Sequence, residues 1–577
     1  MTSTENRLRD YLSLLYGQEA SEAVWNQLKE KLDHFIEANP ELREVSQTQT
    51  LTQKDVMLIT YGDQVREPGL PPLRTLGDIL RAYLDRAVPD VHILPFYPYS
   101  SDDGFSVIDY LQVNPELGTW EDIGNLGRDF RLMFDGVINH ISRESEWFQG
   151  FLRGEEEYLD YFIVEEPETD LSQVFRPRAL PLLTPVETSR GTQYVWTTFS
   201  DDQIDLNYAN PRVLLKILDV VLFYVANKAS FLRLDAIAFL WKVAGTNCIH
   251  LPQTHAAIKL LRAVLDLVAP KVVLITETNV PHQENISYFG DGQEEAQLVY
   301  NFALPPLILH SFHTGDARAL SNWASNLALP SDRVTFFNFL ASHDGIGILP
   351  ARGILSQAEM DALVSRVEAH LGFISYRNLP DGSQVPYEMN INYFDALSNP
   401  GSDEPLDIQI DRFVNAHAIM LAMIGVPGIY FHSLFGSRSW VEGVKMTGMK
   451  RAINRQKLNR QDLENELTDP SLPRAKVLMR LKALLKARAG HRAFDPYAQQ
   501  HILDLSPAIF AILRGETGKD QAMCLHNVSN TAQAVRLDLG QFPKRSAVDM
   551  LSGKIHTVSE KSLQLEPYQT VWLDLNE

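Results

Sequence analysis

Eight short runs of aliphatic and aromatic residues, separated by stretches with helical periodicity, constrain the fold of this chain more than any other feature. Strands that are apolar throughout, with helices between them, are typical of a parallel sheet that is covered by other elements. Eight such units predict an α/β fold with a closed (β/α)8 TIM barrel, and a doubly wound sheet is the alternative. The runs lie at 56–62, 91–96, 131–140, 229–237, 272–277, 296–302, 334–344 and 427–433.

The length of 577 residues and changes in the hydrophobic pattern along the chain predict further domains around this barrel. Apolar residues recur at helical spacing before the first run, and the connection after the third run is too long for a βα loop. Short strand-like runs separated by turn residues end the chain. We expect an N-terminal helical extension, a first part of the barrel, an inserted small domain, the rest of the barrel with a long loop region at 345–400, and a C-terminal antiparallel β domain. Their predicted boundaries are 1–54, 55–140, 141–208, 209–485 and 486–577.

The overall charge and the cysteine content argue against several classes of function. A net charge of −21 disfavours nucleic acid and anionic membranes as partners. Cys248 and Cys524 are far apart and show neither a disulfide framework nor metal-ligand spacing. The first residues lack an apolar signal core, and no uninterrupted apolar run is long enough to span a bilayer. We expect a cytoplasmic protein without a metal site.

Four acidic residues lie at or near the C-terminal ends of predicted barrel strands. Asp135, Asp235, Glu277 and Asp344 belong in this way to the third, fourth, fifth and seventh strands. Each of them alone is compatible with a helix cap or a loop ion pair. Together they predict an active site, because the C-terminal ends of barrel strands meet at one face.

Carboxylates that converge at a barrel mouth suit either a metal site or attack at the anomeric carbon of a sugar. Glycoside chemistry needs one ionised carboxylate and one protonated carboxyl group. Arg233 and Asp235 alternate along one strand and point the same way, so the guanidinium can keep Asp235 ionised. Glu277 has apolar neighbours and no adjacent cation in the sequence, which favours a raised pKa and the role of the acid.

Four short motifs carry a resemblance to a known family. In order and spacing they resemble the motifs of the α-amylase superfamily, glycoside hydrolase family 13. The motifs are DGVINH at 135–140, FLRLDAI at 231–237, LITET at 274–278 and ASHDGIG at 341–347. Further stretches, such as FRPRALPLLTP and RAINRQKL, are similar to the sucrose phosphorylase subfamily of this superfamily.

Two departures from the sucrose-cleaving members favour one branch of that subfamily. Those members usually carry Glu-x-His at the acid, whereas this chain has Glu277, Thr278 and Asn279. The helical extension before residue 50 is a second departure from the shorter sucrose phosphorylases. With TETNVPH and YEMNINY, the chain resembles the glucosylglycerate phosphorylase branch most.

The resemblance implies a role for each candidate site residue. It implies that Asp235 is the nucleophile, that Glu277 is the acid and then the base, and that Asp344 stabilises the transition state. The substrate-binding residues that it implies are Asp102, His140, Arg233, His343, Arg455, Asn279 and Tyr387. The phosphate-binding residues that it implies are Arg176, Arg178 and Tyr387. It implies no cofactor and no metal ion.

The residues expected around the second substrate leave alternatives open. Arg176 and Arg178 either bind phosphate or form loop ion pairs with nearby acidic residues. Glu388 stands where the family carries glutamine, and its charge would repel a phosphate dianion. It therefore points away, pairs with an arginine or serves the acceptor. Asn279 and His282 are candidate hydrogen-bond donors to glycerate.

The resemblance as a whole implies a retaining α-glucoside phosphorylase with two small-molecule partners, a sugar substrate and inorganic phosphate. It would convert glucosylglycerate and phosphate into α-glucose 1-phosphate and glycerate through a covalent β-glucosyl-enzyme. The alternatives are phosphorolysis of sucrose, sucrose 6'-phosphate or glucosylglycerol, and a retaining α-glucosidase or transglucosidase. A non-catalytic sugar-binding module and a metal-dependent barrel enzyme fit the residues less well. Both a monomer and a homodimer are compatible with the sequence.

Overall fold

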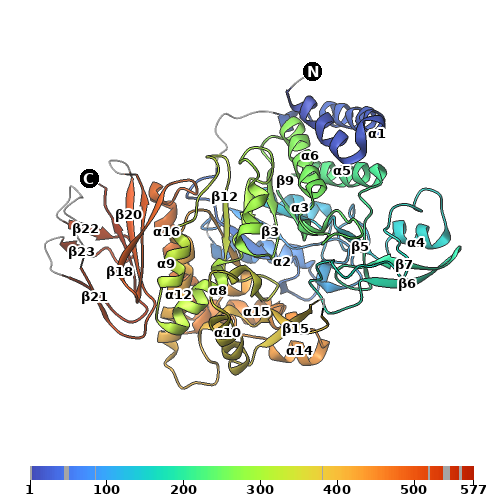
Figure 1. Cartoon of the computed structure of the whole chain (residues 1–577). Helices are drawn as coiled ribbons and strands as arrows, with labels where there is room; N and C mark the ends of the chain where they lie inside the picture. The colour runs from blue at the N-terminus through green and yellow to red at the C-terminus, as the bar shows by residue number, and fades with distance from the viewer. Residues whose placement is uncertain are drawn as a thin grey trace.

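Eight parallel strands close into a barrel at the centre of the molecule (Figure 1). The computed structural model describes residues 3–43, 51–84, 86–379, 381–516, 520–536, 546–557 and 562–576. Around the barrel the strand order is β1-β16-β12-β11-β10-β9-β4-β3. The strands are β1 Met57–Thr60, β3 Asp90–Ile93, β4 Arg131–Gly136, β9 Ala229–Leu234, β10 Val273–Thr276, β11 Leu298–Tyr300, β12 Thr335–Phe339 and β16 Val426–Tyr430. All eight lie within or overlap the predicted apolar runs, and their closure confirms the barrel over the doubly wound alternative.

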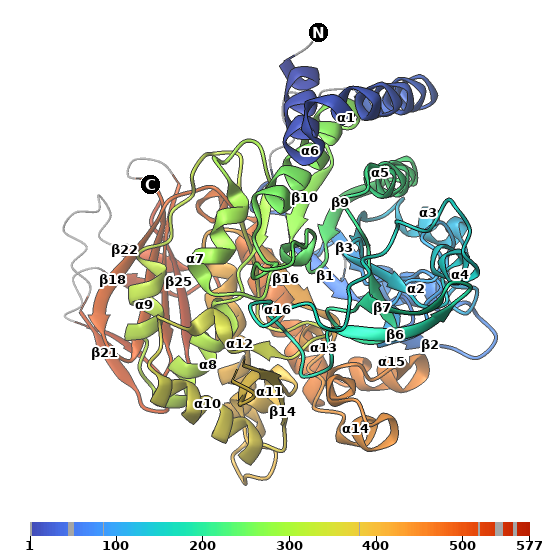
Figure 2. The same cartoon turned by 45° about the vertical axis from the view of Figure 1, so that its right-hand side comes forward.

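Amphipathic helices connect these strands and cover the outside of the barrel (Figure 2). Several begin with proline in the first turn, where its missing N–H is not needed, as α5 and α6 do. The Asn210 side chain also caps α5 by accepting a hydrogen bond from the Arg212 backbone N–H. The main helices are α2 Pro72–Leu84, α3 Trp120–Leu126, α5 Pro211–Ala226, α6 Pro252–Val268, α8 Leu304–Thr314, α9 Arg318–Ala324, α12 Leu406–Ala422 and α16 Pro473–Ala489.

The register of three neighbouring strands brings charged residues to one end of the barrel. Asp135 on β4 pairs in register with Arg233 on β9, and Arg233 pairs with Ile275 on β10. Asp235 directly follows β9 and Glu277 directly follows β10. Because parallel strands end at the same face, this register places three carboxyl groups around one guanidinium.

The long connection after β4 folds as an antiparallel insertion. Its strands β5 (His140–Ser142) and β8 (Gln203–Asp205) pair with each other, and β6 (Leu183–Thr188) pairs with β7 (Gly191–Trp196). Helix α4 (Glu146–Arg153) packs beside this hairpin at the edge of the molecule (Figure 1). The β5–β8 pairing sets His140 directly opposite Asp205.

The segment predicted as a long loop at 345–400 is a folded unit instead. Strands β13 (Ile346–Gly347), β15 (Gln384–Asn390) and β14 (Phe373–Asn378) form an antiparallel sheet. Helix α10 (Gln357–Ala369) has a Ser356–Glu359 capping box, and helix α11 (Tyr393–Leu397) follows the sheet. The β14–β15 hairpin has no strong apolar pattern in the sequence, because its strands are only half buried at their outer ends.

The N-terminal extension is helical, as predicted, over the residues that are described. Helix α1 (Ser3–Ala38) packs on α6 and α5, and a short 3-10 turn at Pro40–Arg43 follows it. Gly17 kinks α1 with a positive φ of 77°, a conformation that favours glycine. The expected helical residues 44–50 lie outside the described part of the chain.

A C-terminal antiparallel β domain packs beside the barrel (Figure 1). Its larger sheet has the order β18-β19-β20-β25-β22-β23, and β21 pairs with β24. The strands are β18 Gln500–Ser506, β19 Ile509–Gly515, β20 Gln521–Asn527, β21 Gln533–Val535, β22 Ser546–Asp549, β23 Ile555–Thr557, β24 Leu563–Leu565 and β25 Thr570–Asp574. This confirms the predicted domain type over the residues that the structure describes, and residues 537–545 of the predicted domain lie outside them.

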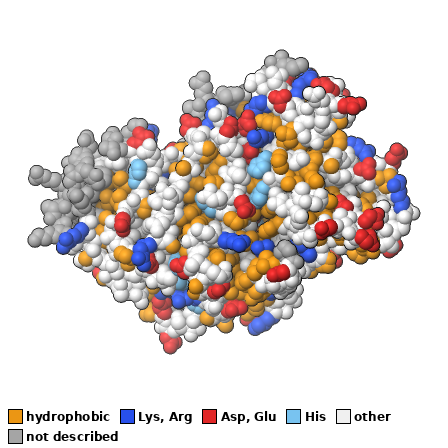
Figure 3. All heavy atoms as spheres, viewed as in Figure 1, with side chains coloured by type: hydrophobic (Ala, Val, Ile, Leu, Met, Phe, Trp, Pro, Cys, Tyr) orange, Lys and Arg blue, Asp and Glu red, His pale blue; other side chains and the backbone are white. Residues whose placement is uncertain are grey.

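Acidic and basic side chains are interspersed with apolar atoms over the face shown in Figure 3. None of the helices in the described ranges is long and apolar enough to cross a membrane.

Candidate active site

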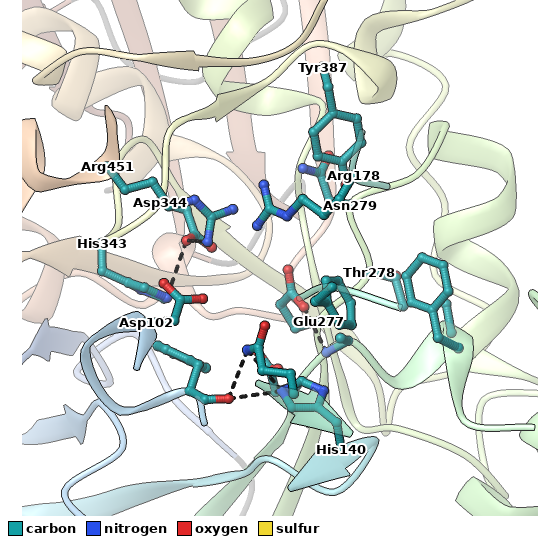
Figure 4. Close-up of a pocket in the computed structure, with 17 residues that line it drawn as sticks. Asp102, His140, Arg178, Glu277, Thr278, Asn279, His343, Asp344, Tyr387 and Arg451 are labelled. Carbon is teal, nitrogen blue, oxygen red and sulfur yellow. Dashed lines mark hydrogen bonds and ion pairs between the residues drawn. The ribbon is translucent and has the colours of Figure 1, made fainter. Parts of the chain in front are cut away.

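A pocket at the barrel mouth gathers residues from segments that are distant in the sequence (Figure 4). Its walls come from the ends of the barrel strands, the insertion, and the sheet β13–β15. The lining residues are Asp102, Phe105, His140, Arg178, Phe199, Gln203, Asp235, Ala236, Ala238, Phe239, Glu277, Thr278, Asn279, His343, Asp344, Tyr387 and Arg451.

Arg233 lies beneath the pocket and contacts three carboxyl groups. Its Nη1 is 2.9 Å from Asp235 Oδ1 and also contacts Asp135 Oδ1, and its Nη2 is 3.9 Å from Glu277 Oε2. Its guanidinium carbon lies 5.4 Å from the centre of the Tyr300 ring. Because Arg233 is buried and cannot lose its proton, it favours the ionised form of whichever carboxylate it contacts most directly.

Asp135 is a supporting carboxylate below the pocket and is absent from its lining. Burial disfavours its charge, but Arg233 and His92 outweigh burial and lower its pKa to about 2. His92 Nε2 lies 2.6 Å from Asp135 Oδ2. Asp135 therefore stays ionised and fixes the position of Arg233.

Glu277 is the carboxyl group whose environment most favours the protonated form. Burial, followed by the charges of Asp235 and Asp344, raises its pKa to about 7 against the opposing charge of Arg233. Its Oε2 accepts a hydrogen bond of 2.9 Å from the Ala236 backbone N–H. Ala236 has a φ of 49°, an uncommon conformation for alanine that recurs at functional sites.

Asp235 and Glu277 differ in how closely they contact Arg233. Burial raises the pKa of Asp235 as well, but the Arg233 contact at 2.9 Å opposes that shift more strongly than the contact at 3.9 Å does for Glu277. We assign the ionised form to Asp235 and the protonated form to Glu277 at neutral pH. A cation does lie near Glu277, contrary to the impression given by its neighbours in the sequence.

A second cluster of opposite charges forms the inner end of the pocket. Arg455 Nη1 lies 3.2 Å from Asp102 Oδ1, and its Nη2 lies 3.6 Å from Asp344 Oδ1. Burial disfavours the charge of Asp102, but Arg455, Arg451 and Arg178 outweigh it and lower the pKa. Asp102 thus keeps an acceptor-only carboxylate that can receive hydrogen bonds from sugar hydroxyls.

Two histidines face the same end of the pocket. His343 stacks on Phe105 with ring centroids 4.6 Å apart, and burial together with Arg455 lowers its pKa well below the usual value. His140 Nε2 lies 2.9 Å from the Phe105 carbonyl oxygen and 3.2 Å from Gln203 Nε2. His343 is therefore neutral, and both rings line the pocket.

The outer end of the pocket carries two arginines that share one carboxylate. Arg178 Nη1 is 3.6 Å from Glu388 Oε2, while Arg451 Nη2 is 3.0 Å from the same oxygen. Arg451 Nη1 also lies 2.5 Å from Asp344 Oδ1. Of the three options open for Glu388, the structure selects pairing with arginine. Burial raises the pKa of the Tyr387 phenol, which therefore remains a hydrogen-bond donor beside Arg178.

Arg176 and His282, two of the candidates for contact with the second substrate, do not reach this pocket. Arg233 and Arg455 are also absent from its lining, but they contact its carboxylates. Arg176 is half buried and is absent from the lining, whereas Arg178, two residues later, is part of it. The intervening Pro177 is buried, so the rigid Arg-Pro-Arg segment turns only its second arginine inward. His282 packs against Trp323, with ring centroids 5.6 Å apart, and is also absent from the lining.

Asn279 does line the pocket and is held by the neighbouring sheet. Its side chain lies so close to Gly347 that a Cβ added there would be 2.4 Å from Asn279 Oδ1. That Oδ1 is buried and has no hydrogen-bond partner among the described atoms. This oxygen therefore faces Gly347, and Asn279 borders the pocket without turning its Oδ1 toward the pocket space.

Arg451 is the main site residue that sequence reasoning missed. It precedes Arg455 by four residues in RAINRQKL, the motif that contains both arginines. The two arginines lie in and directly after the 3-10 turn Lys450–Asn454, and both contact Asp344. The spacing of two arginines within one motif was the available signal.

The acidic and histidine residues of the described chain do not form a metal site. No group of three or more His, Cys, Asp or Glu side chains within the described ranges has a geometry that could hold a metal ion. The pocket carboxylates are paired with arginines instead.

Comparisons with known families and proteins match this architecture along almost the whole chain. The catalytic domain of alpha amylase matches residues 83–348, and the C-terminal domain of maltogenic amylase matches residues 501–572. A glucosylglycerate phosphorylase of Allomeiothermus silvanus is 50% identical over 98% of this chain and 97% of its own length. One of Escherichia coli is 44% identical over 99% of this chain and 100% of its own length.

A solved structure shares the same fold at lower identity. The crystal structure of sucrose 6F-phosphate phosphorylase from Thermoanaerobacter thermosaccharolyticum matches with a TM-score of 0.73 at 23% identity. The match covers 91% of this chain and 100% of that one.

Proposed function

This chain belongs to the α-amylase family and is a glucoside phosphorylase of that family, and from this premise we propose that its substrates are glucosylglycerate and inorganic phosphate. In the proposed reaction the α-glucosyl group passes to phosphate, giving α-glucose 1-phosphate and free glycerate. The relatives that are 44% to 50% identical along the whole chain carry this name and support the choice of substrate.

One observation carries the proposed mechanism, which is the division of charge between two neighbouring carboxyl groups. Asp235 contacts Arg233 directly and is ionised, while the pKa of Glu277 is raised to about 7 by burial and by the nearby carboxylates. A retaining enzyme needs this pairing of a charged nucleophile with a neutral acid.

In the proposed first step, a carboxylate oxygen of Asp235 attacks the anomeric carbon of the glucosyl group. The bond from that carbon to the glycerate oxygen breaks as Glu277 gives its proton to the leaving oxygen. The products are free glycerate, ionised Glu277 and a β-glucosyl ester on Asp235. Asp344, paired with Arg451, lies beside the developing positive charge.

In the proposed second step, a phosphate oxygen attacks the same carbon and displaces the Asp235 carboxylate. Glu277 receives the proton if the attacking phosphate oxygen carries one, and the double displacement restores the α configuration. Arg178 and Tyr387 line the outer end of the pocket and are proposed to orient the phosphate.

The inner end is proposed to bind a single glucose unit. Asp102 and Arg455 are paired there at 3.2 Å, and His140 and His343 face the same space. The Asn279 amide stands at the outer side, next to Arg178 and Tyr387, where the glycerate would leave (Figure 4). These roles agree with the charges and hydrogen-bonding capacity of each side chain.

Product analysis by NMR tests the proposal directly. The enzyme is incubated with phosphate and, in separate samples, with glucosylglycerate, sucrose, glucosylglycerol and sucrose 6'-phosphate. We expect α-glucose 1-phosphate from glucosylglycerate at a rate that rises with phosphate concentration. Formation chiefly from sucrose would overturn the acceptor, and free glucose formed at a rate independent of phosphate would overturn phosphorolysis.

A further inference from the structure

A buried lysine that the proposed chemistry does not use lies behind the pocket. Lys242 Nζ is 2.6 Å from Asp205 Oδ2 and 2.8 Å from Asn139 Oδ1. The side chains of Lys242 and Asp205 are 2% and 0% exposed, and Asn139 is fully buried. None of these three residues lines the pocket. A buried ion pair is weak evidence of added stability, so its arrangement invites another explanation.

This ammonium group joins three separate segments of the chain. Asn139 follows strand β4 of the barrel, and Asp205 ends strand β8 of the insertion. Lys242 belongs to the loop after β9, only seven residues beyond Asp235. Asp205 also accepts hydrogen bonds from the Thr198 backbone N–H at 2.8 Å and from the Thr198 hydroxyl at 2.6 Å. The carboxylate is therefore fully satisfied and fixed in orientation.

The ammonium group determines which way the Asn139 amide faces. A lysine ammonium only donates hydrogen bonds, so the Asn139 atom next to it must be the carbonyl oxygen. The amide nitrogen then points to the other side, where it lies 3.2 Å from His140 Nδ1. It is also 3.2 Å from Asp205 Oδ2, which can only accept.

The orientation of this amide in turn fixes the proton of His140. Because Asn139 Nδ2 donates, His140 Nδ1 must accept, and a neutral ring then carries its proton on Nε2. Nε2 is the pocket-side nitrogen, since its two neighbours, Phe105 and Gln203, both line the pocket. The Phe105 carbonyl oxygen at 2.9 Å is its present acceptor, and the same oxygen also accepts from Gln203 Nε2 at 3.0 Å. The 3.2 Å contact between His140 Nε2 and Gln203 Nε2 therefore joins two donors to one carbonyl and is not itself a hydrogen bond.

We propose that Lys242 is a positioning residue that acts through Asn139 to hold His140 in the tautomer whose N–H faces the glucosyl group. Lys242 fixes the orientation of the Asn139 amide, and that amide fixes which nitrogen of His140 carries the proton in the pocket. A His140 ring in the other tautomer would present an acceptor to a sugar hydroxyl instead of a donor. The kinetic part of this inference rests on the proposed function, whereas the tautomer itself does not.

The first test removes the ion pair without leaving a buried charge behind. In the double variant Lys242→Met with Asp205→Asn, both partners become neutral, and such replacements are often tolerated by the fold. We expect the thermal midpoint to remain within a few degrees of wild type, while kcat/KM for glucosylglycerate falls about 100-fold because the histidine is misplaced. Lys259→Ala is the matched control, since Lys259 pairs with Glu294 and Glu295 on the outside of α6 and should leave kcat/KM unchanged.

The second test keeps Lys242 and exchanges the amide at position 139 with the carboxylate at position 205. In the exchange Asn139→Asp with Asp205→Asn, net charge is conserved, but His140 Nδ1 now faces a carboxylate oxygen that cannot donate. We expect ¹⁵N NMR of histidine-labelled protein to place the His140 proton on Nε2 in wild type and on Nδ1 in the exchange variant. The His140 signal is identified by its loss in His140→Asn.

The outcomes separate this inference from the proposed function. A folded double variant with wild-type kcat/KM, or an Nδ1 proton on His140 in wild type, would overturn the positioning role. An inactive wild type would instead overturn the proposed function, and the NMR measurement would still decide the tautomer. Lower kcat/KM in Lys259→Ala to the same extent would show a general effect of lost ion pairs and would also contradict the proposal.

Discussion

The two ends of the pocket are built on different principles. At the inner end, Asp235, Asp344 and Asp102 follow barrel strands and are held by Arg233 and Arg455. At the outer end, Arg178 and Tyr387 come from the insertion and from β15, and Glu388 is the carboxylate that holds Arg178. The inner carboxylates are positioned by the closed barrel, whereas the outer arginines are positioned by segments that only meet in the folded protein.

Under the proposed function, this difference suits the inner end to a glucosyl group that stays bound and the outer end to the exchange of glycerate for phosphate. Asp102 at the inner end has a cation partner that lowers its pKa, so it keeps its charge and its position. The contact between Arg178 and Glu388 is long, at 3.6 Å, and Arg178 is 25% exposed on its side chain. A partly exposed cation with a loosely placed partner can change partners between an anionic leaving group and phosphate.

The largest expected effect comes from breaking the inner end at its nucleophile. Asp235→Ala should lower kcat at least about 10⁴-fold, because no carboxylate remains to form the ester. The fold should persist, since removing this charge relieves the desolvation of a buried group. Release of α-glucose 1-phosphate measures kcat, and the thermal midpoint measures whether the fold persists. Substantial turnover in a folded variant would refute Asp235 as the nucleophile.

Glu277→Gln should have the next largest effect, and its size should depend on the leaving group. For glucosylglycerate we expect a loss of roughly 10² to 10⁴-fold, the usual contribution of a positioned acid. A substrate with a good leaving group, such as α-glucosyl fluoride, needs no protonation and should lose far less in the glucosyl-transfer step. Equal losses on both substrates would argue against the acid role.

The same residue predicts the alkaline limb of the pH profile. Glu277 must be protonated to act as the acid, and its pKa is raised to about 7. As pH rises above 7, the protonated fraction falls tenfold per unit, so kcat/KM for glucosylglycerate should fall in parallel. This limb should disappear in Glu277→Gln, and its persistence there would assign it to another group.

A pair of arginine variants sharpens the contrast at the outer end. Arg178→Ala should raise KM for phosphate about 10- to 100-fold, as expected for lost hydrogen bonds to a charged group. Arg176→Ala, which alters a residue outside the pocket lining, should change KM for phosphate less than about twofold. Steady-state kinetics with varied phosphate provides the measurement, and equal effects of both changes would contradict the assignment.

The smallest expected effect is at Glu388. Glu388→Gln keeps the shape but removes a charge that repels phosphate, so KM for phosphate should fall a few-fold. Arg451 would retain Asp344 as a partner, which limits any structural change. A rise in KM for phosphate would show that Glu388 is needed to hold the arginines in place.

Much of the inner end was predictable because it depends on local pattern. Alternation along one strand already placed Arg233 and Asp235 on the same side, and the contact at 2.9 Å agrees with that expectation. The outer end was less predictable, because contacts between an insertion and a distant sheet leave no periodic signal. Arg176 and Arg178 look alike in the sequence, and only the folded loop distinguishes them.

The sequence by itself determined the barrel, the C-terminal β domain and the identity of the carboxyl groups at the strand ends. These follow from hydrophobic periodicity and short motifs, which are properties of neighbouring residues. Only the tertiary structure decided the partners of Glu388, the entry of Arg451 into the pocket, and the contact of Lys242 with Asn139 and Asp205. Such pairings join residues tens to hundreds of positions apart. The strength of an ion pair depends on the distance between its charges and on their burial, and neither can be read from neighbouring residues in the sequence.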